Sequence, residues 1–390
     1  MKTIQDRLDF QICRPILGIP LFLLIMYIVF SLSFSGFGAW ITEILGTICF
    51  RLTEIFQNSL FAAKVNETFI SFLINVISDV ASVLSFLPQT AIFFFLLKAL
   101  SECGYMSRAI FAMDTFLYRF GLSGNALIPL AIGCGCSVPA ILASKELEAE
   151  EQNILIPSIP FLLCNARFPV LFFLIDTFFP KHKALTAFLF YLLSVFTVFL
   201  SCLLSSSRKQ APLLILNLEN YQIPKIRILL QEAKDKSLEY LSRTISLIFL
   251  CAVGLRLSSI LTYSFRFTEA EAKSLLYFLG EKLSVLFLPL GFGKAPFSAA
   301  LLAGFFAKEN LLFVLEMLSH EEISASLTLP ARISFIAFSM LYLPCFSAVS
   351  TLFKEAGAKK TALLLLRTFS ISYILSWILY TLSNALVAFV

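Results

Sequence analysis

The sequence has few charged residues. Lys, Arg, Asp and Glu make up 14% of its 390 residues, whereas 58% of the residues are hydrophobic. A soluble domain has about 25% charged residues and about 45–50% apolar residues. The composition therefore excludes an ordinary soluble protein and predicts a polytopic membrane protein whose main partner is the lipid bilayer.

Histidine is almost absent, and cysteine does not follow a disulfide pattern. The two histidines, His182 and His320, lie in loop-like sequence, which argues against a histidine-based metal site. The nine cysteines lie mostly inside hydrophobic segments, which argues against a disulfide framework. The net charge of +5 arises from Lys and Arg in three polar regions. By the positive-inside tendency these regions face the cytoplasm, so the charge does not indicate a nucleic-acid partner.

Long runs without charge are present, and a run of about 20 apolar residues can cross a bilayer. These runs cover residues 15–42, 80–97, 120–144, 184–207, 333–353 and 368–390. Two further hydrophobic spans, near residues 154–179 and 244–260, contain one or two charges each. Together they predict an all-α protein with roughly seven to nine crossings. We expect residues 36–69 to form a loop with an amphipathic interfacial piece.

Proline and glycine interrupt the run at residues 120–144. Two prolines and two glycines fall within eleven positions, at Pro129, Gly133, Gly135 and Pro139. Proline removes a backbone donor and glycine is a poor helix former, so a continuous helix is not expected. Lipid cannot satisfy the backbone groups that such a break frees, which must be buried in protein or line a polar cavity. Because the thiols of Cys134 and Cys136 lie at the break, we identify it as a candidate transport site.

The second half of the chain repeats this pattern. Each half has a Pro-Leu pair, a nearby glycine, a small-residue helix and a Lys-Glu pair that marks a helix end. The pairs are Pro129-Leu130 and Lys145-Glu146 in the first half, and Pro289-Leu290 and Lys308-Glu309 in the second half. A proline followed by a thiol also occurs twice, at Pro160 with Cys164 and at Pro344 with Cys345. Interrupted segments in corresponding positions of two halves are typical of transporters with a site near the midplane.

We therefore predict an all-α polytopic integral membrane protein with two inverted-repeat halves, each carrying a Pro/Gly-interrupted broken helix. The predicted parts are a cytoplasmic lead at residues 1–15, a first membrane half with one gate at 16–207, a cytoplasmic loop and surface helix at 208–243, and a second membrane half with a second gate at 244–390.

Several motifs occur in a fixed order along the chain. In the first half they are Gly104-Tyr105-Met106-Ser107-Arg108-Ala109, Gly133-Cys134-Gly135-Cys136-Ser137-Val138-Pro139-Ala140 and Cys164-Asn165-Ala166-Arg167-Phe168-Pro169-Val170. In the second half they are Leu288-Pro289-Leu290-Gly291-Phe292, Gly304-Phe305-Phe306-Ala307-Lys308-Glu309 and Tyr342-Leu343-Pro344-Cys345. Over essentially the whole chain, this series resembles the membrane domain of the FeoB ferrous iron transporters. The resemblance implies Fe2+ as the transported ion, no permanently bound cofactor, and a location in the bacterial cytoplasmic (inner) membrane.

The resemblance also implies roles for individual residues. Cys136 and Cys345 match the gate cysteines that would contact the ion, with Cys134 and Cys164 as further metal ligands. The gate and transport path would contain Pro129, Gly133, Gly135, Ser137, Pro139, Pro289, Gly291, Gly293 and Glu309. Arg167 lies in an apolar span, where a cation costs about 2.5–3.5 kcal/mol, so we expect a structural charge with an acidic or carbonyl partner.

The sequence departs from the family pattern in three places. It has no Gly-x4-Gly-Lys-Ser/Thr phosphate loop, since Gly291-Phe292-Gly293-Lys294 lacks this spacing. We therefore expect no enzyme activity and no catalytic residue, and any GTPase would be a separate G-domain protein. Cys134 and Ser137 stand where the family has an aromatic residue and an asparagine, and Lys294 places a cation at the second gate. These changes leave Mn2+ or another divalent metal open, because the ligand preferences of such ions overlap.

Two other functions remain open from the sequence. One is a gate-domain permease of the nucleoside-transporter or spore-maturation type, which would move another solute and would not need the thiols. The other is a non-transporting membrane scaffold of a split FeoB system. The partners that the FeoB resemblance implies, besides the G-domain protein, are a small FeoA-like protein and further copies of this chain in a homo-oligomer.

Overall fold

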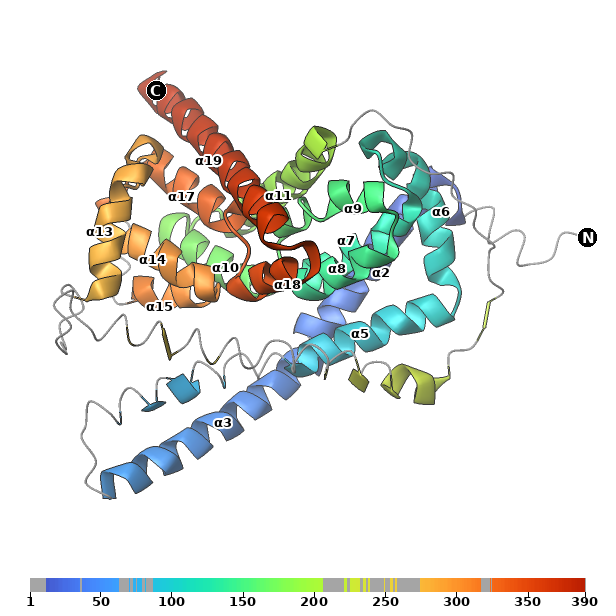
Figure 1. Ribbon diagram of the computed structural model, residues 1–390, viewed down its shortest axis with the longest axis horizontal. Helices are drawn as coiled ribbons and strands as arrows, with labels where there is room; N and C mark the ends of the chain where they lie inside the picture. Colours follow the sequence, from blue (N-terminus) through green and yellow to red (C-terminus); the bar gives the residue numbers. More distant parts are fainter. Residues whose placement is uncertain are drawn as a thin grey trace, which may run out of the picture. The chain divides into compact units, whose positions relative to one another are not determined.

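In the computed structural model, all secondary-structure elements of the described residues are helices (Figure 1). It describes residues 12–35, 37–62, 87–205, 274–316 and 325–389, with residue 323 and short pieces within 70–81 and 221–257. Three segments predicted from the sequence fall largely outside these residues, namely 1–15, 208–243 and 244–260. The four-part division of the chain therefore stays a prediction.

The chain forms two compact units by its internal contacts. The first comprises Met1–Ala131 and Ser206–Ala252, and the second comprises Ile132–Ser205 and Val253–Val390. The first unit contains α2 (Pro15–Phe30), the π-helix η1 (Ser31–Ser35), α3 (Phe37–Ala62), α5 (Leu87–Glu102), α6 (Tyr105–Leu117) and the 3-10 turns η2 (Tyr118–Phe120) and η3 (Gly124–Ala126). Helix α7 (Leu127–Gly135) begins in the first unit and ends in the second.

The second unit contains the remaining elements. Its first part contains α8 (Ser137–Ala143), η4 (Ser144–Glu146), α9 (Ala149–Leu155), η5 (Ile159–Phe161), α10 (Arg167–Phe178) and α11 (Lys183–Ser205). Its second part contains α13 (Leu275–Phe287), η7 (Leu288–Leu290), α14 (Ala295–Phe306), α15 (Asn310–Glu316), α17 (Leu329–Leu341), α18 (Phe346–Ala356) and α19 (Ala358–Phe389).

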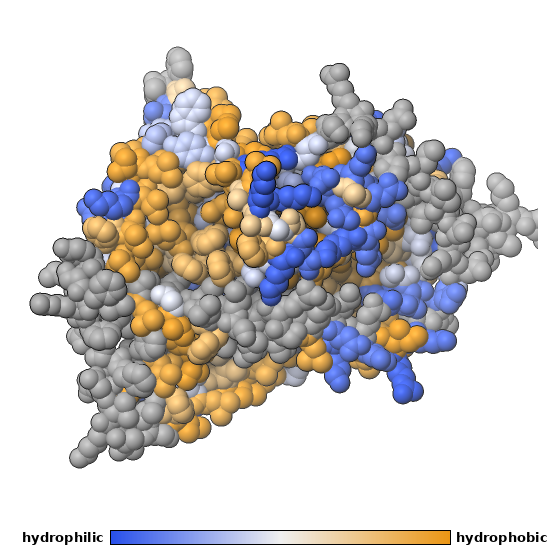
Figure 2. Space-filling model, viewed as in Figure 1, coloured by the Kyte–Doolittle hydropathy of each residue, from blue (hydrophilic) through white to orange (hydrophobic). Residues whose placement is uncertain are grey.

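Three helices of the described chain are long and apolar enough to cross a membrane, at Ile16–Ser33, Lys183–Ser205 and Ala358–Leu386. Two bent pairs raise this number to five if each pair is one span: Leu275–Leu290 with Ala295–Phe306, bent by 105°, and Leu329–Leu341 with Phe346–Ala356, bent by 42°. Large apolar side chains are exposed along these helices, and Figure 2 shows broad hydrophobic areas on the viewed face. Such surface is stable against lipid and not against water. The chain is an all-α polytopic membrane protein.

Two expectations about the helices are wrong. Residues 36–69 were expected to form a loop with an amphipathic interfacial piece, but residues 37–62 of this range form α3, a continuous helix of 26 residues. It contains no proline, so no backbone hydrogen bond is lost inside the helix. Its charged residues form a polar side of the helix. The hydrophobic span expected near residues 154–179 is divided into α9, η5 and α10. Pro160 lies in η5 and Pro169 in the first turn of α10, where a missing N–H costs no helical hydrogen bond.

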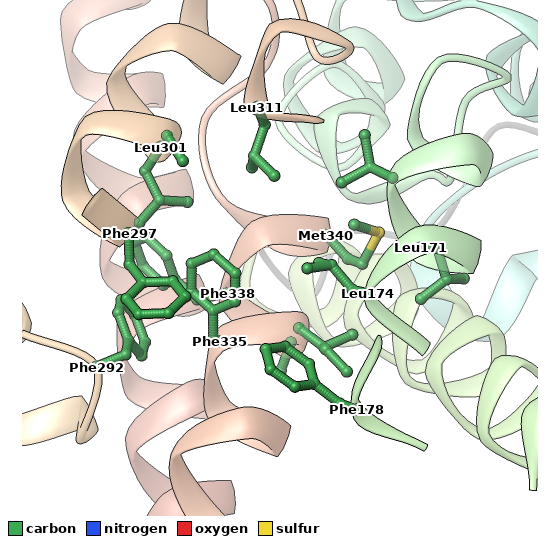
Figure 3. Close-up of a cluster of buried hydrophobic side chains, with 14 of the residues drawn as sticks. Leu171, Leu174, Phe178, Phe292, Phe297, Leu301, Leu311, Phe335, Phe338 and Met340 are labelled. Atoms are coloured by element: carbon green, nitrogen blue, oxygen red, sulfur yellow. The ribbon is translucent and has the colours of Figure 1, made fainter. Parts of the chain in front are cut away.

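An aromatic core holds the second unit together (Figure 3). Phe335 of α17 makes edge-to-face contacts with Phe292 and Phe297, at centroid distances of 5.2 Å and 5.0 Å. Edge-to-face aromatic pairs contribute about 0.5–1.5 kcal/mol beyond the area that they bury. Leu171 and Leu174 of α10 belong to the same buried cluster. The core therefore fixes α10, α14 and α17, which carry the residues described below.

The turn between α13 and α14 depends on Gly291. Its φ of +84° lies in the left-handed region that favours glycine, and a Cβ at this position would lie 2.3 Å from the Tyr380 ring of α19. Pro289 is the second residue of the preceding turn η7 (Leu288–Leu290). The 105° bend between the two helices thus has a local backbone cause and packs against α19.

Candidate transport site

The run at residues 120–144 is broken, as predicted from its prolines and glycines. Helix α7 ends at Gly135, and Cys136 is extended (φ −152°, ψ 135°) before α8 begins at Ser137. Pro139 lies in the first turn of α8, where its missing N–H costs no helical bond. A Cβ on Gly133 would lie 2.4 Å from the Leu162 side chain, so a glycine here permits the close approach of the chain around Leu162.

A second break carries Cys345. Helix α17 ends at Leu341, Tyr342 is extended, and Cys345 is the extended residue (φ −63°, ψ 157°) before α18. The backbone N–H of Val349 donates to the Cys345 carbonyl at 3.1 Å, which starts α18. Cys345 therefore has the same position relative to α18 that Cys136 has relative to α8.

Helices α8 and α18 are in contact within the second unit. Each begins directly after a candidate gate cysteine. Beyond the far end of α8, the Lys145 ammonium forms an ion pair with the Glu355 carboxylate of α18. The two broken spans thus contribute two adjacent helices, α8 and α18. The ion pair between Lys145 and Glu355 connects them at the ends that are far from the thiols.

Arg167 links the second break to the chain before α10. It is 2% exposed. Its guanidinium donates to the carbonyl oxygens of Pro160 at 2.7 Å and Leu162 at 3.1 Å, and to that of Tyr342 at 3.1 Å. The planar guanidinium has five N–H donors in a fixed fork, which suits several acceptors at once. The partners of this intramembrane cation are therefore backbone carbonyls.

Lys308 reaches the same break from another direction. Helix α14 ends at Phe306 and α15 begins at Asn310, so Lys308 lies in the short connection between them, as the Lys-Glu pair predicted. Its side chain, however, is only 3% exposed. The ammonium donates to the carbonyl of Leu343 at 2.7 Å and lies 3.5 Å from the centroid of the Tyr342 ring.

Cys164 lies in the short segment between η5 and α10. The neighbouring Asn165 N–H donates to the Gly135 carbonyl at 3.1 Å, which joins this segment to the first break. None of the four candidate cysteines forms a disulfide, and all four have intermediate exposure.

The thiols do not form a closed metal centre. Among the described residues, no group of three or more His, Cys, Asp or Glu side chains is arranged to hold a metal ion. A structural zinc site would have four such ligands. The arrangement instead places individual thiols near the helix breaks, beside backbone carbonyls that accept hydrogen bonds from Arg167 and Lys308.

The remaining predicted path residues have different surroundings. Ser137 is buried as the first residue of α8. Gly291 packs on Tyr380, and Gly293 packs on the backbone of Leu288. Glu309 is half-buried in the connection before α15. Their roles in a transport path stay predictions.

Sequence reasoning missed three contributors to this cluster: Asn165, Lys308 and Tyr342. Lys308 was interpreted only as a helix end. A lysine inside a long apolar stretch was the available signal, because an intramembrane cation is costly and needs a partner. Nothing local in the sequence indicates that the Tyr342 hydroxyl donates to the Leu301 carbonyl at 3.0 Å or that its ring faces the Lys308 ammonium.

Comparison with known proteins gives matches in sequence. A family model described as "Gate: Nucleoside recognition" matches residues 83–178. The Fe(2+) transporter FeoB of Staphylococcus aureus (strain MSSA476) is 30% identical over 98% of this chain and 60% of its own length. The Fe(2+) transporter FeoB of Campylobacter jejuni is 29% identical over 97% of this chain and 65% of its own length. No solved structure matches the chain.

A further relative from Porphyromonas gingivalis is named "Fe(2+) transport protein A/Fe(2+) transporter FeoB fusion protein". It is 26% identical over 97% of this chain and 52% of its own length. The chain thus spans less than two thirds of the length of the curated relatives that it matches. Because these matches extend over nearly the whole of this chain, it belongs to the FeoB family and corresponds to the membrane part of those proteins.

Proposed function

We propose that this chain forms a multi-pass pathway that carries Fe2+, or a related divalent metal, into the cytoplasm across a bacterial cytoplasmic (inner) membrane. One observation supports this most directly. Cys136 and Cys345 each end a helix break, and each stands at the start of one of two contacting helices, α8 and α18. One span broken near Gly135 and Pro139 and another broken near Pro344 therefore bring one thiol each to the starts of two contacting helices.

The chemistry of these groups suits a passing Fe2+ ion. Fe2+ accepts thiolate and oxygen ligands, and a permeating ion must bind weakly enough to leave again. Hydrogen bonds from Asn165 to the Gly135 carbonyl and from Arg167 to the Tyr342 carbonyl tie the segment that contains Cys164 to both breaks, so Cys164 would serve as an intermediate ligand between them. Because each position along the path would offer the Fe2+ ion only a few ligands, the ion could leave one position for the next.

Membrane potential would supply enough energy for uptake. Moving two positive charges inward gains about 4.6 kcal/mol per 100 mV, twice the value for a single charge. This energy corresponds to roughly three decades of accumulation, at about 1.4 kcal/mol per decade. A separate G-domain protein or a small FeoA-like protein would then act as a regulator, and the chain would assemble as a homo-oligomer.

Proteoliposomes that contain the purified chain test the proposal. With an inside-negative potential, we expect Fe2+ uptake. We expect Cys136→Ser and Cys345→Ser each to lower the uptake rate by roughly tenfold or more, because losing even a residue that only orients a metal ligand lowers metal affinity or activity by about 10–100-fold. Cys49→Ser in α3 is the matched control and should keep the wild-type rate. Full uptake by both gate variants would refute the role of the thiols.

The family model matched at residues 83–178 favours one second candidate, a gate-domain permease for a different solute. Such a permease would not need the thiols. Uptake of nucleosides that is unchanged in Cys136→Ser and Cys345→Ser, without Fe2+ uptake, would favour it. A non-transporting scaffold would give neither flux.

A further inference from the structure

Lys308 is a buried cation in the same cluster as the candidate metal ligands. Its ammonium is 2.7 Å from the Leu343 carbonyl oxygen, and Leu343 is two residues before Cys345. Its position is therefore beside the second thiol of the proposed path.

The contacts of this ammonium are those of a bound cation. A backbone carbonyl outside a helix and the face of an aromatic ring are the two groups that it meets, at Leu343 and Tyr342. Carbonyl oxygens are the ligands with which ion pathways replace the water around a cation. The Tyr342 ring adds a cation–π contact, which strengthens when water is excluded.

We propose that the Lys308 ammonium is a tethered cation that occupies the cation position beside Cys345, and that a divalent metal takes this position only when the ammonium leaves the Leu343 carbonyl. This inference rests on the proposed function, because it takes Cys345 to meet the metal. A divalent ion and an ammonium within a few ångströms repel each other strongly where water is scarce. The two cations therefore exclude one another, and Lys308 closes the site until a metal replaces it.

Metal protection of Cys345 measures this competition without any flux. Purified full chain in detergent is treated with N-ethylmaleimide at increasing Co2+, a redox-stable probe, and modification of Cys345 is quantified by mass spectrometry. For Lys308→Met we expect the half-protective Co2+ concentration to fall by roughly tenfold or more, which corresponds to about 1.4 kcal/mol. Lys308→Arg, which keeps the charge, should stay near wild type. Lys282→Met, on exposed α13 surface, is the matched control and should not change.

Charged thiol reagents provide a second measurement. In the wild type, an anionic methanethiosulfonate should modify Cys345 faster than a cationic one, and Lys308→Met should reduce this preference. The wild-type preference needs no variant to fold, so its absence overturns the proposal even if Lys308→Met is unstable. An unchanged half-protective Co2+ concentration in folded Lys308→Met also overturns it.

The proposed function and this inference can fail separately. If Co2+ protects Cys345 in no variant while proteoliposomes still take up Fe2+, the inference is wrong and the transport proposal stands. If Lys308→Met shifts the Co2+ protection but no variant transports Fe2+, the inference stands and the transport proposal is wrong.

Discussion

Arg167 offers a quantitative test of how the helix breaks are held together. Arg167→Met keeps a long apolar side chain and removes the guanidinium, with its hydrogen bonds of 2.7 Å, 3.1 Å and 3.1 Å to three carbonyls. A hydrogen bond to a charged group contributes about 1.5–3 kcal/mol. The loss is offset because the variant no longer buries a cation, which costs several kcal/mol. We expect the free energy of unfolding to fall by about 3 kcal/mol.

Arg167→Lys separates charge from geometry. A lysine keeps the cation, but its single ammonium lacks the fork that reaches Pro160, Leu162 and Tyr342 at the same time. Its stability should therefore lie between those of Arg167→Met and the wild type. Arg332→Met is the control, since Arg332 donates to the Leu327 carbonyl of its own segment.

Thermal unfolding of the detergent-solubilised protein measures these differences, and Arg167→Met should unfold several degrees below the wild type. Modification of Cys164 by N-ethylmaleimide is a second readout, because the segment that Arg167 fixes contains this thiol. Unfolding of Arg167→Met at the wild-type temperature, with an unchanged Cys164 modification rate, would show that the three hydrogen bonds do not hold the breaks together.

Two further predictions concern the turn at Gly291 and the link between α8 and α18. Gly291→Ala should lower the unfolding temperature, because φ is +84° and the new Cβ would overlap the Tyr380 ring, at a cost of about 1–3 kcal/mol; Gly46→Ala, with open space around it, should be neutral or stabilising in the same thermal assay. Lys145→Glu and Glu355→Lys should each lower Fe2+ uptake in proteoliposomes, and the double variant should recover it. The coupling should be no more than about 1 kcal/mol because Lys145 is half-exposed. A double variant no better than either single one would exclude a role for the pair.

The positions of the helix breaks could be predicted from the sequence because their causes are local. Proline and glycine act on the backbone at their own positions, so Gly135 and Pro139 marked the break at Cys136 before any packing was known. The spans at Ile16–Ser33 and Lys183–Ser205 followed in the same way from uninterrupted apolar residues. The error at α3 has a different origin, since residues 36–69 were expected to form a loop with an amphipathic piece although no proline lies within the 26 residues of this helix.

The assembly of the breaks could not be predicted, because it depends on long-range packing. Arg167 and Tyr342 are far apart in sequence, and only the fold of the second unit joins the segments that carry Cys164 and Cys345. The same holds for Lys308, which a local pattern places at an exposed helix end and which the fold buries against Leu343. Residue types thus indicated candidate ligands, whereas the surroundings of these residues required the structure.

Two buried cations beside a proposed metal path require a physical explanation, since both oppose a divalent ion. Their hydrogen bonds give them different roles. Arg167 donates to three carbonyls on two segments, so its side chain is held in place. Its charge therefore repels a divalent ion at all times, and binding of the ion to the thiols must exceed this repulsion. Lys308 reaches Leu343 on a flexible four-carbon stem, so its repulsion disappears when the ammonium moves away. A fixed cation limits how tightly the path can hold a metal, whereas a movable one decides when the path is open.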